Sequence, residues 1–312
     1  MFQSAILSQS VFRAALPAVT LILLLATIFT LQPRAMSVFG INLMLNLAVP
    51  IALATMAQLF IIAINDLDLS IGSFVGLVAC IGATWLNDSP LLGVAALAAC
   101  VLAYACLGAL IHIRRLPSIV VTLGMSFVWL GLAVMLLPTP GGASPTWLRQ
   151  LMSFRAPYVP VPIVASIIIA AAVHYGLMRT SYGTILRGFG GNPQAMRRSG
   201  WSMLRATMTM YALAGLFGVL AGLALLGIST SADANIALRY TLLSIAGAIL
   251  GGCEFVGGRV SPVGTVLGVL TLALAGSALT FLRISPDWQV GAQGAILIVV
   301  LALRAAVARK ES

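Results

Sequence analysis

The sequence predicts an all-α, polytopic membrane protein with about ten transmembrane helices, folded as one transmembrane domain over residues 1–312. Composition is the first observation behind this fold class. Of the residues, 61% are hydrophobic and only 8% are charged, and the mean hydropathy is +1.08. Soluble domains carry about 25% charged residues, so this chain has too few to cover a surface that faces water. Lipid is therefore its expected surrounding.

Apolar segments of membrane-spanning length are the second observation, since a span needs about 20 residues of helix. Ten segments qualify, at residues 15–33, 41–64, 70–86, 91–112, 118–137, 157–178, 203–226, 240–253, 262–281 and 289–304. The third and eighth are short, as are helices that break within a membrane. No clear cleavage site follows the first segment, so we expect it to remain as an uncleaved span.

The placement of basic residues predicts the orientation, because cytoplasmic loops carry an excess of arginine and lysine. With the N-terminus inside, eleven basic residues face the cytoplasm: Arg13, Arg114, Arg115, Arg179, Arg187, Arg197, Arg198, Arg205, Arg304, Arg309 and Lys310. Five face outward: Arg34, Arg149, Arg155, Arg239 and Arg283. Both termini are therefore predicted to be cytoplasmic. This pattern also explains the net charge of +10 without a nucleic-acid partner.

Two loops are long enough to form elements of their own. The outer loop 138–160 is rich in proline and glycine and carries aromatic residues, which favours an element lying on the outer membrane surface. In the inner loop 179–202, we predict a short helix with Asn192 as N-cap, Pro193 in the first turn and Gly200 at the end.

An internal repeat is suggested by two glycine motifs. "DLSIGSFVGL", from Asp68 to Leu77, resembles "GRVSPVGTVLGV", from Gly258 to Val269. Both copies enter the membrane from the cytoplasmic side in the predicted topology, so they would be two parallel pseudo-repeats with broken helices. Gly-x-x-x-Gly patterns are also ordinary contacts between membrane helices, and this alternative stays open.

Enzyme chemistry has no recognisable signature in this chain, so no catalytic residue is predicted. No phosphate-binding Gly-x-x-x-x-Gly-Lys-[Ser/Thr] loop occurs, and Lys310 is the sole lysine. The four cysteines lie in apolar segments without paired spacing, and are expected to be small buried residues and not metal ligands. His112 and His174 have no nearby partner residues, so no metal site is expected.

Four motifs, in order, give the chain a resemblance to a known family. They are "DLDLSIGS", "RLPSIVVTLG", "RTSYGTILRGFGGNPQAMRRSG", and "AGAILGGCEFVGGRVSPVGTVLG" followed by "ISPDWQ". Together they resemble the permease subunits of ribose-type ABC importers, within the ribose and branched-chain-amino-acid permease family. The resemblance covers about residues 40–304.

The resemblance implies a division of labour among several chains. It implies a second permease chain, two cytoplasmic ABC ATPase domains that bind ATP and Mg, and a periplasmic protein that delivers a small polar solute, usually a monosaccharide. This chain would then bind no cofactor and would lie in the bacterial inner membrane. The residues implied in ATPase coupling are Arg187, Gly190, Gly191, Asn192, Pro193, Arg197, Arg198 and Gly200, which we expect to form a capped helix on a glycine hinge.

The chain also departs from the family pattern. Asn65 and Asp66 stand where the family has two glycines, Cys253 and Glu254 stand where small or hydroxyl residues are typical, and Val260 replaces a glycine. These changes weaken any transfer of substrate identity, and they are compatible with pairing to a different permease chain.

Asp66 and Asp68 are unexpected in a span, because a carboxylate at mid-membrane costs about 2.5–3.5 kcal/mol or more unless it is paired or hydrated. Three interpretations stay open: a cap on the helix that follows, an ion pair with Arg259, and contact with the solute. The candidates for the translocation path or core motif are Asn42, Asn46, Gln58, Asn65, Asp66, Asp68, Ser70, Thr122, Glu254, Arg259 and Ser261.

The leading functional hypothesis is a permease for a monosaccharide. Import of nucleosides or branched-chain amino acids by the same kind of transporter is the first alternative. An ion-coupled secondary transporter is the second, with Asp66, Asp68 and Glu254 as proton or sodium ligands.

Overall fold

The described part of the chain is helical, which confirms the all-α fold class. The computed structural model describes residues 18–30, 32–255 and 257–284 and the single positions 288, 291, 294, 295 and 298, and these residues form no β-strand beyond one bridge between Gly141 and Ala232. After a helix at Ala18–Thr30, the elements are η1 (Pro33–Met36), α2 (Val38–Met44), α3 (Ala48–Ile62), α4 (Ile71–Ala83), α5 (Trp85–Asp88), α6 (Pro90–Arg114), α7 (Ser118–Leu136), α8 (Thr146–Ser153), α9 (Val161–His174), the π-helix η2 (Tyr175–Arg179), α10 (Ser181–Gly191), α11 (Pro193–Arg198), α12 (Met203–Ser229), α13 (Tyr240–Leu250) and α14 (Pro262–Phe281).

Six helical stretches in this part of the chain are long and apolar enough to cross a membrane, or seven if a bent pair counts as one span. The bent pair is α2 with α3, which meet at 45°. Nine of the ten predicted segments contain a helix, but those at 18–30 and 240–250 are shorter than a span. The tenth segment, 289–304, lies outside the described residues apart from the four positions 291, 294, 295 and 298. The chain is therefore a multi-pass membrane protein, and a count of ten spans is not established.

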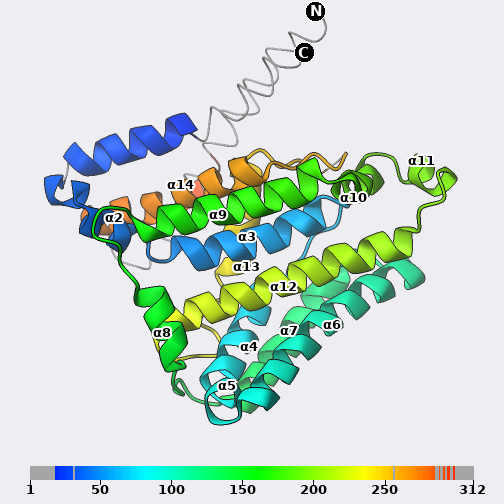
Figure 1. Ribbon diagram of the computed structural model, residues 1–312, viewed down its shortest axis with the longest axis horizontal. Coiled ribbons are helices and arrows are strands. Elements are labelled where there is room, and N and C mark those ends of the chain that lie inside the picture. Colours follow the sequence, from blue (N-terminus) through cyan, green and yellow to red (C-terminus); the bar gives the residue numbers. More distant parts are fainter. Residues whose placement is uncertain are drawn as a thin grey trace, which may run out of the picture.

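The long helix α12 forms the centre of the molecule, as Figure 1 shows. Helices α3 and α9 lie on one side of it, and α4, α6 and α7 lie on the other (Figure 1). Helix α3 packs against α12, α13, α14 and α9, so it joins the two halves of the chain. Residues far apart in the sequence thus meet around α3 and α12.

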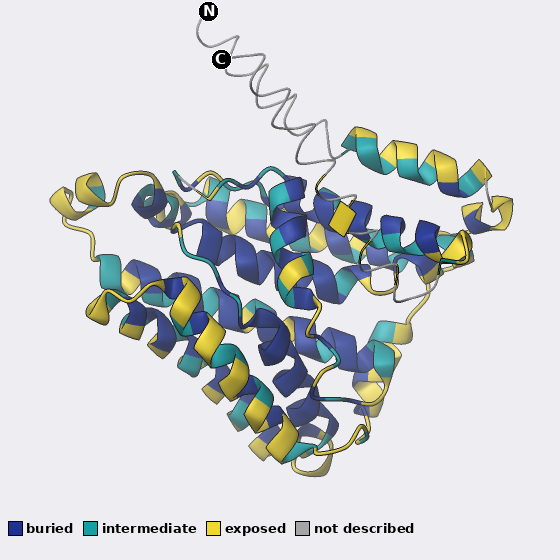
Figure 2. Ribbon diagram, turned by 180° about the vertical axis from the view of Figure 1, so that it is seen from behind, coloured by how far each residue is buried: buried dark blue, intermediate teal, exposed yellow. Residues whose placement is uncertain are grey.

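Burial divides the helices into an inner and an outer group, visible in Figure 2. All thirteen residues of α4 are buried, and Val49 is the only residue of α3 that is not. Helix α7 instead buries only Ser118, Thr122, Trp129 and Ala133 and exposes leucine, valine and phenylalanine elsewhere. An exposed apolar face of this kind suits contact with lipid, because lipid tails offer polar groups no hydrogen-bond partners.

The cysteine prediction is correct for three residues and wrong for the fourth. Cys80, Cys100 and Cys253 are buried, and none of the four cysteines forms a disulfide. Cys106 is exposed on α6, because an outer helix turns part of its apolar surface away from the protein. Apolar surroundings in the sequence therefore do not imply burial within a membrane protein.

Small residues let α12 approach its neighbours closely. A Cβ added to Gly218 would lie 2.7 Å from the Phe74 ring, and one added to Gly215 would lie 2.8 Å from the Cβ of Tyr104. Close approach at glycines is the usual way in which membrane helices gain packing energy, because burial of apolar surface gives little advantage over lipid. These contacts fix α4 and α6 against the centre.

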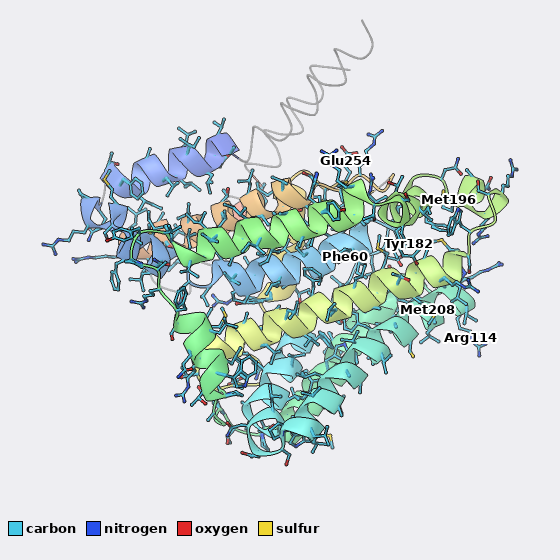
Figure 3. All side chains as sticks on the ribbon, in the orientation of Figure 1. Phe60, Arg114, Tyr182, Met196, Met208 and Glu254 are labelled. Atoms are coloured by element: carbon cyan, nitrogen blue, oxygen red, sulfur yellow. The ribbon has the colours of Figure 1, made fainter. Side chains whose placement is uncertain are left out.

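The two predicted loop elements lie at opposite ends of the molecule (Figure 1). Helix α8 occupies the outer loop, as predicted, and the side chain of Met152 packs against Gly227 of α12. Helices α10 and α11 occupy the inner loop at the other end, where Figure 3 also places Tyr182, Met196 and Arg114. The Tyr182 hydroxyl lies 3.2 Å from Thr209 Oγ1, which links α10 to α12.

Candidate functional site

The connection between α3 and α4 is the centre of the candidate site. We call residues 65–70 the acid motif, since Asp66 and Asp68 lie within it. The chain leaves helix α3 at Ala63 and starts helix α4 at Ile71, so the backbone between them is irregular, and it is only partly buried. Non-helical backbone at membrane depth needs a hydrogen-bond partner for each polar group. The question is therefore where those partners come from.

Side chains of the surrounding helices supply most of the partners. Ser118 Oγ accepts from the amide of Leu67 at 3.3 Å, and Thr122 Oγ1 accepts from the amide of Leu69 at 3.1 Å. The Gln58 amide donates to the carbonyl oxygen of Asp68 at 3.0 Å and accepts from its N–H at 3.1 Å. Side chains of α3 and α7 thus hold the backbone of the break.

Asp68 is buried and accepts three hydrogen bonds. Its Oδ1 accepts from the backbone N–H and from the hydroxyl of Ser70, both at 2.7 Å, and its Oδ2 accepts from the Tyr104 hydroxyl at 2.8 Å. Ser70 immediately precedes α4, so Asp68 bonds the chain where it enters that helix, and capping of the amides within α4 stays a prediction. Tyr104 ties the acid motif to α6.

An aromatic cluster holds the Tyr104 ring in place. The ring centroid of Phe74 lies 4.4 Å from that of Tyr104, and the Trp129 ring is stacked parallel to Tyr104 at 6.1 Å. Aromatic pairs at such separations stabilise by about 0.5–1.5 kcal/mol beyond the area that they bury. Because Tyr104 is rigid, its hydroxyl is already aimed at Asp68.

Asp66 lies in a different environment, at the wall of an open cavity. Its Oδ2 accepts from the Tyr211 hydroxyl at 3.2 Å, and its side chain is only partly buried. The cavity has a volume of about 840 Å³, and its polar lining comes from Asp66, His112, Arg115, Arg197 and Thr207. We call it the cytoplasmic cavity, because it lies at the end of the molecule that holds α10 and α11, which the arginine counts predict to face the cytoplasm. One motif thus presents one sequestered carboxylate and one accessible carboxylate.

The second break, between α13 and α14, shows that the proposed ion pair with Arg259 is wrong. Arg259 Nη1 lies 3.4 Å from Glu254 Oε2, and the Arg259 side chain is 70% exposed. A guanidinium in this exposed position is paired within its own loop, while the buried Asp68 is bonded to Ser70 and Tyr104. Ser261 caps α14 by accepting from Gly264 N–H at 3.1 Å.

The predicted coupling helix is confirmed as an element. Helix α11 spans Pro193–Arg198, and the Asn192 side chain accepts from the amide of Ala195 at 3.0 Å as its N-cap. Gly200 follows with a φ of +84°, as expected for a residue that ends a helix. Arg197 and Arg198 are exposed in its last turn.

The expected glycine hinge before this helix stays a prediction, and the structure adds a packing role for one of its glycines. Gly190 and Gly191 are the last residues of α10, a helix that the sequence did not suggest. A Cβ on Gly190 would overlap the carbonyl oxygen of Ala63 and lie 2.8 Å from the Cα of Gly258. Gly190 is therefore required by close packing against both breaks.

Asn42 and Asn46 lie far from the acid motif, at the outer end. Both line a cavity of about 500 Å³ that Arg149, Arg155 and Thr230 also border. Asn42 Oδ1 accepts from the amide of Val161 at 3.1 Å, so it also ties α2 to α9. The polar candidates thus divide into an outer group, a buried group and a cytoplasmic group.

Four important residues of the site were missed from the sequence: Tyr104, Ser118, Tyr211 and Thr241. Thr241 accepts from the amide of Gly72 at 3.0 Å, in the first turn of α4. A phenol inside a long apolar helix needs a hydrogen-bond partner, which was a usable signal for Tyr104 and Tyr211. Serine and threonine commonly bond within their own helix, so Ser118 and Thr241 carried no comparable signal.

Comparison with known proteins adds a second line of evidence. The family described as "Branched-chain amino acid transport system / permease component" matches residues 40–301. The galactose/methyl galactoside import permease protein MglC of Escherichia coli (strain K12) is 29% identical, over 91% of this chain and 92% of that protein. The ribose import permease proteins RbsC of Escherichia coli (strain K12) and Bacillus subtilis (strain 168) are 27% and 28% identical, over 91% and 92% of this chain and 91% of each relative. No solved structure matches.

The match extends through both breaks, the acid motif and helices α10 and α11, and so includes every part of the candidate site at its inner end. Among the described residues, no three His, Cys, Asp or Glu side chains are grouped to hold a metal ion. A polytopic helical fold and a match over most of the chain lead to one conclusion. The chain belongs to the family of permease components of branched-chain-amino-acid-type transport systems.

Proposed function

We propose that this chain is the permease subunit of an ABC importer for a monosaccharide. The observation that carries the proposal is the similarity to galactose and ribose import permeases over about nine-tenths of both chains. In this proposal a periplasmic binding protein delivers the solute, two cytoplasmic ATPase domains bind ATP and Mg, and a second permease chain completes the path. The chain itself is a non-catalytic subunit of the inner membrane, without a cofactor.

The structure suggests different roles for the polar candidates. Gln58, Asp68, Ser70 and Thr122 are each at most 1% exposed and are bonded to the acid motif, which supports a structural role. Asp66 at the cytoplasmic cavity, and Asn42 and Asn46 at the outer cavity, are the side chains that we propose for solute contact. We propose that Arg187, α11 and its two terminal arginines dock on the ATPase.

Import of branched-chain amino acids is the second candidate, because the family's own description names that substrate class. The binding protein decides between the two classes, since it selects the solute. Uptake of labelled leucine, without uptake of labelled galactose or ribose, by a reconstituted complex would favour the amino-acid candidate. Uptake of monosaccharides alone would favour the sugar candidate.

The test of the mechanism is transport in proteoliposomes that contain this chain, its ATPase and its binding protein. We expect uptake to need ATP and the binding protein, and to continue when a protonophore collapses the proton gradient. Uptake that needs no ATPase and stops with the protonophore would contradict the proposal and favour an ion-coupled transporter that uses Asp66.

A further inference from the structure

We propose that Asn65 is a positioning residue that ties helix α10 to the acid motif, so that a movement of α10 and α11 reaches Asp66 and the cytoplasmic cavity. The inference rests on the proposed function, because it assumes that an ATPase moves these two helices. It assigns a role to a residue that departs from the family pattern, which has glycine at this position.

The tie is a single hydrogen bond between segments far apart in the sequence. Asn65 Nδ2 donates to the carbonyl oxygen of Gly190 at 2.7 Å, across 125 positions of the chain. Asn65 has a φ of +64°, in the left-handed region that asparagine tolerates better than most residues. Asparagine therefore combines the turn that the break requires with a side-chain donor that glycine lacks.

The hydrogen bond is formed at a point where three segments meet. The last turn of α10 contacts the first break at Ala63 and the second break at Gly258, and each contact needs a glycine. A Cβ on Gly258 would overlap the carbonyl oxygen of Arg187 and lie 3.3 Å from that of Ala63. Because backbones touch here without intervening side chains, a displacement of α10 by one ångström cannot be absorbed locally.

Helix α10 is itself held as a rigid element. Arg187 Nε donates to the carbonyl oxygen of Leu177 at 3.0 Å, which fastens α10 to η2. Helix α11 contrasts with it, since no residue of Pro193–Arg198 is buried. A partner that binds α11 therefore pulls on the last turn of α10, where the Gly190 carbonyl oxygen accepts from Asn65.

Movement of α10 and α11 reaches the cytoplasmic cavity from two sides. Arg197 of α11 lines one part of the cavity, and Asp66, the residue next to Asn65, lines another. A hydrogen bond weakens steeply when its geometry departs from the observed 2.7 Å, so Asn65 either follows α10 or loses the bond. In the first case the Asp66 carboxylate moves with the coupling helices, and the cavity changes shape.

The test compares solute imported per ATP hydrolysed in proteoliposomes of the complete complex. Asn65→Asp keeps the size of the side chain and its tolerance of positive φ but replaces the N–H donor with an oxygen. Asn65→Gly keeps the backbone conformation and removes the side chain. Asn87→Asp is the matched control, because Asn87 is exposed at the opposite end and bonds only to Asp88 among the contacts described for its side chain.

We expect both Asn65 variants to assemble with the ATPase and to lower the ratio of solute to ATP about fivefold, the effect of one ordinary hydrogen bond. The control should keep the wild-type ratio. An unchanged ratio in both variants would overturn the inference, whether solute import and ATP hydrolysis both keep their wild-type rates or both fall by the same factor. So would failure of both to assemble, since Asn65 would then be needed for folding alone. If the wild-type complex shows no ATP-driven import, the proposed function fails instead.

Discussion

Asp68 illustrates how a carboxylate is kept inside a membrane helix bundle. Its two oxygens receive three donors from two elements, and its own backbone is held by Gln58. Hydrogen bonds to a charged group are each worth about 1.5–3 kcal/mol, which offsets much of the cost of burial. The neighbouring Asp66 has one hydroxyl donor and an open cavity, so the same residue type serves two roles within three positions.

We expect Asp68→Ala to lower the free energy of unfolding by about 2–4 kcal/mol, because the Ser70 and Tyr104 hydroxyls lose their acceptor in a buried site. Asp68→Asn is the matched control: its amide oxygen can still accept from Ser70, so the loss should be about 1 kcal/mol. Thermal unfolding in detergent and the yield of assembled complex measure the effect. Normal assembly of Asp68→Ala with a loss of solute selectivity alone would contradict a structural role.

At the level of elements, breaks between helices organise the protein more than the long spans do. Helix α3 ends and α4 begins around irregular backbone that α6, α7, α10 and α12 all contact through Tyr104, Ser118, Gly190 and Tyr211. The second break between α13 and α14 meets the same helix α10 at Gly258. Helix α10 thus touches both breaks.

For the coupling segment, we predict that reversing both arginine charges, Arg197→Glu with Arg198→Glu, abolishes stimulation of ATP hydrolysis by the loaded binding protein. The arginines are exposed at the end of α11, where acidic groups of a partner would meet them. Arg114→Glu is the control, since Arg114 is exposed at the same end but lies on α6. Stimulation at the wild-type level in the double variant would refute the assignment.

On the scale of the whole molecule, the layout places α8 at one end and α10 with α11 at the other (Figure 1). The helices of the outer group have exposed faces (Figure 2), and large apolar side chains lie on them. This arrangement agrees with the distribution of arginines along the sequence, which assigns the α10 end to the cytoplasm. Residues at the two ends are therefore expected to differ in their accessibility to a reagent added outside an intact cell.

A labelling experiment checks this orientation. In a variant without the native cysteines, we expect Gln150→Cys in α8 to react with an impermeant maleimide added to spheroplasts, because α8 faces outward. Gln194→Cys in α11 should react only after the membrane is opened. Both side chains are exposed on the protein, so the membrane alone should decide whether the maleimide reaches them. The reverse labelling pattern would invert the topology.

The sequence by itself determined the class of the protein, the positions of most helices and the short capped helix α11. These depend on local quantities: apolar length, arginine counts and the Asn192–Pro193 start signal. It also marked Asp66, Asp68 and the second break as unusual, since their polarity contrasts with their neighbours.

Only the tertiary structure decided what these residues touch. The pairing of Asp68 with Tyr104 and of Asn65 with Gly190 depends on how helices cross, and no periodicity encodes that crossing. The division of Asp68 and Asp66 into a buried and an accessible acid has the same origin. In a bundle whose surfaces are apolar on both the lipid and the protein side, hydropathy does not tell the inner face from the outer, and packing alone selects it.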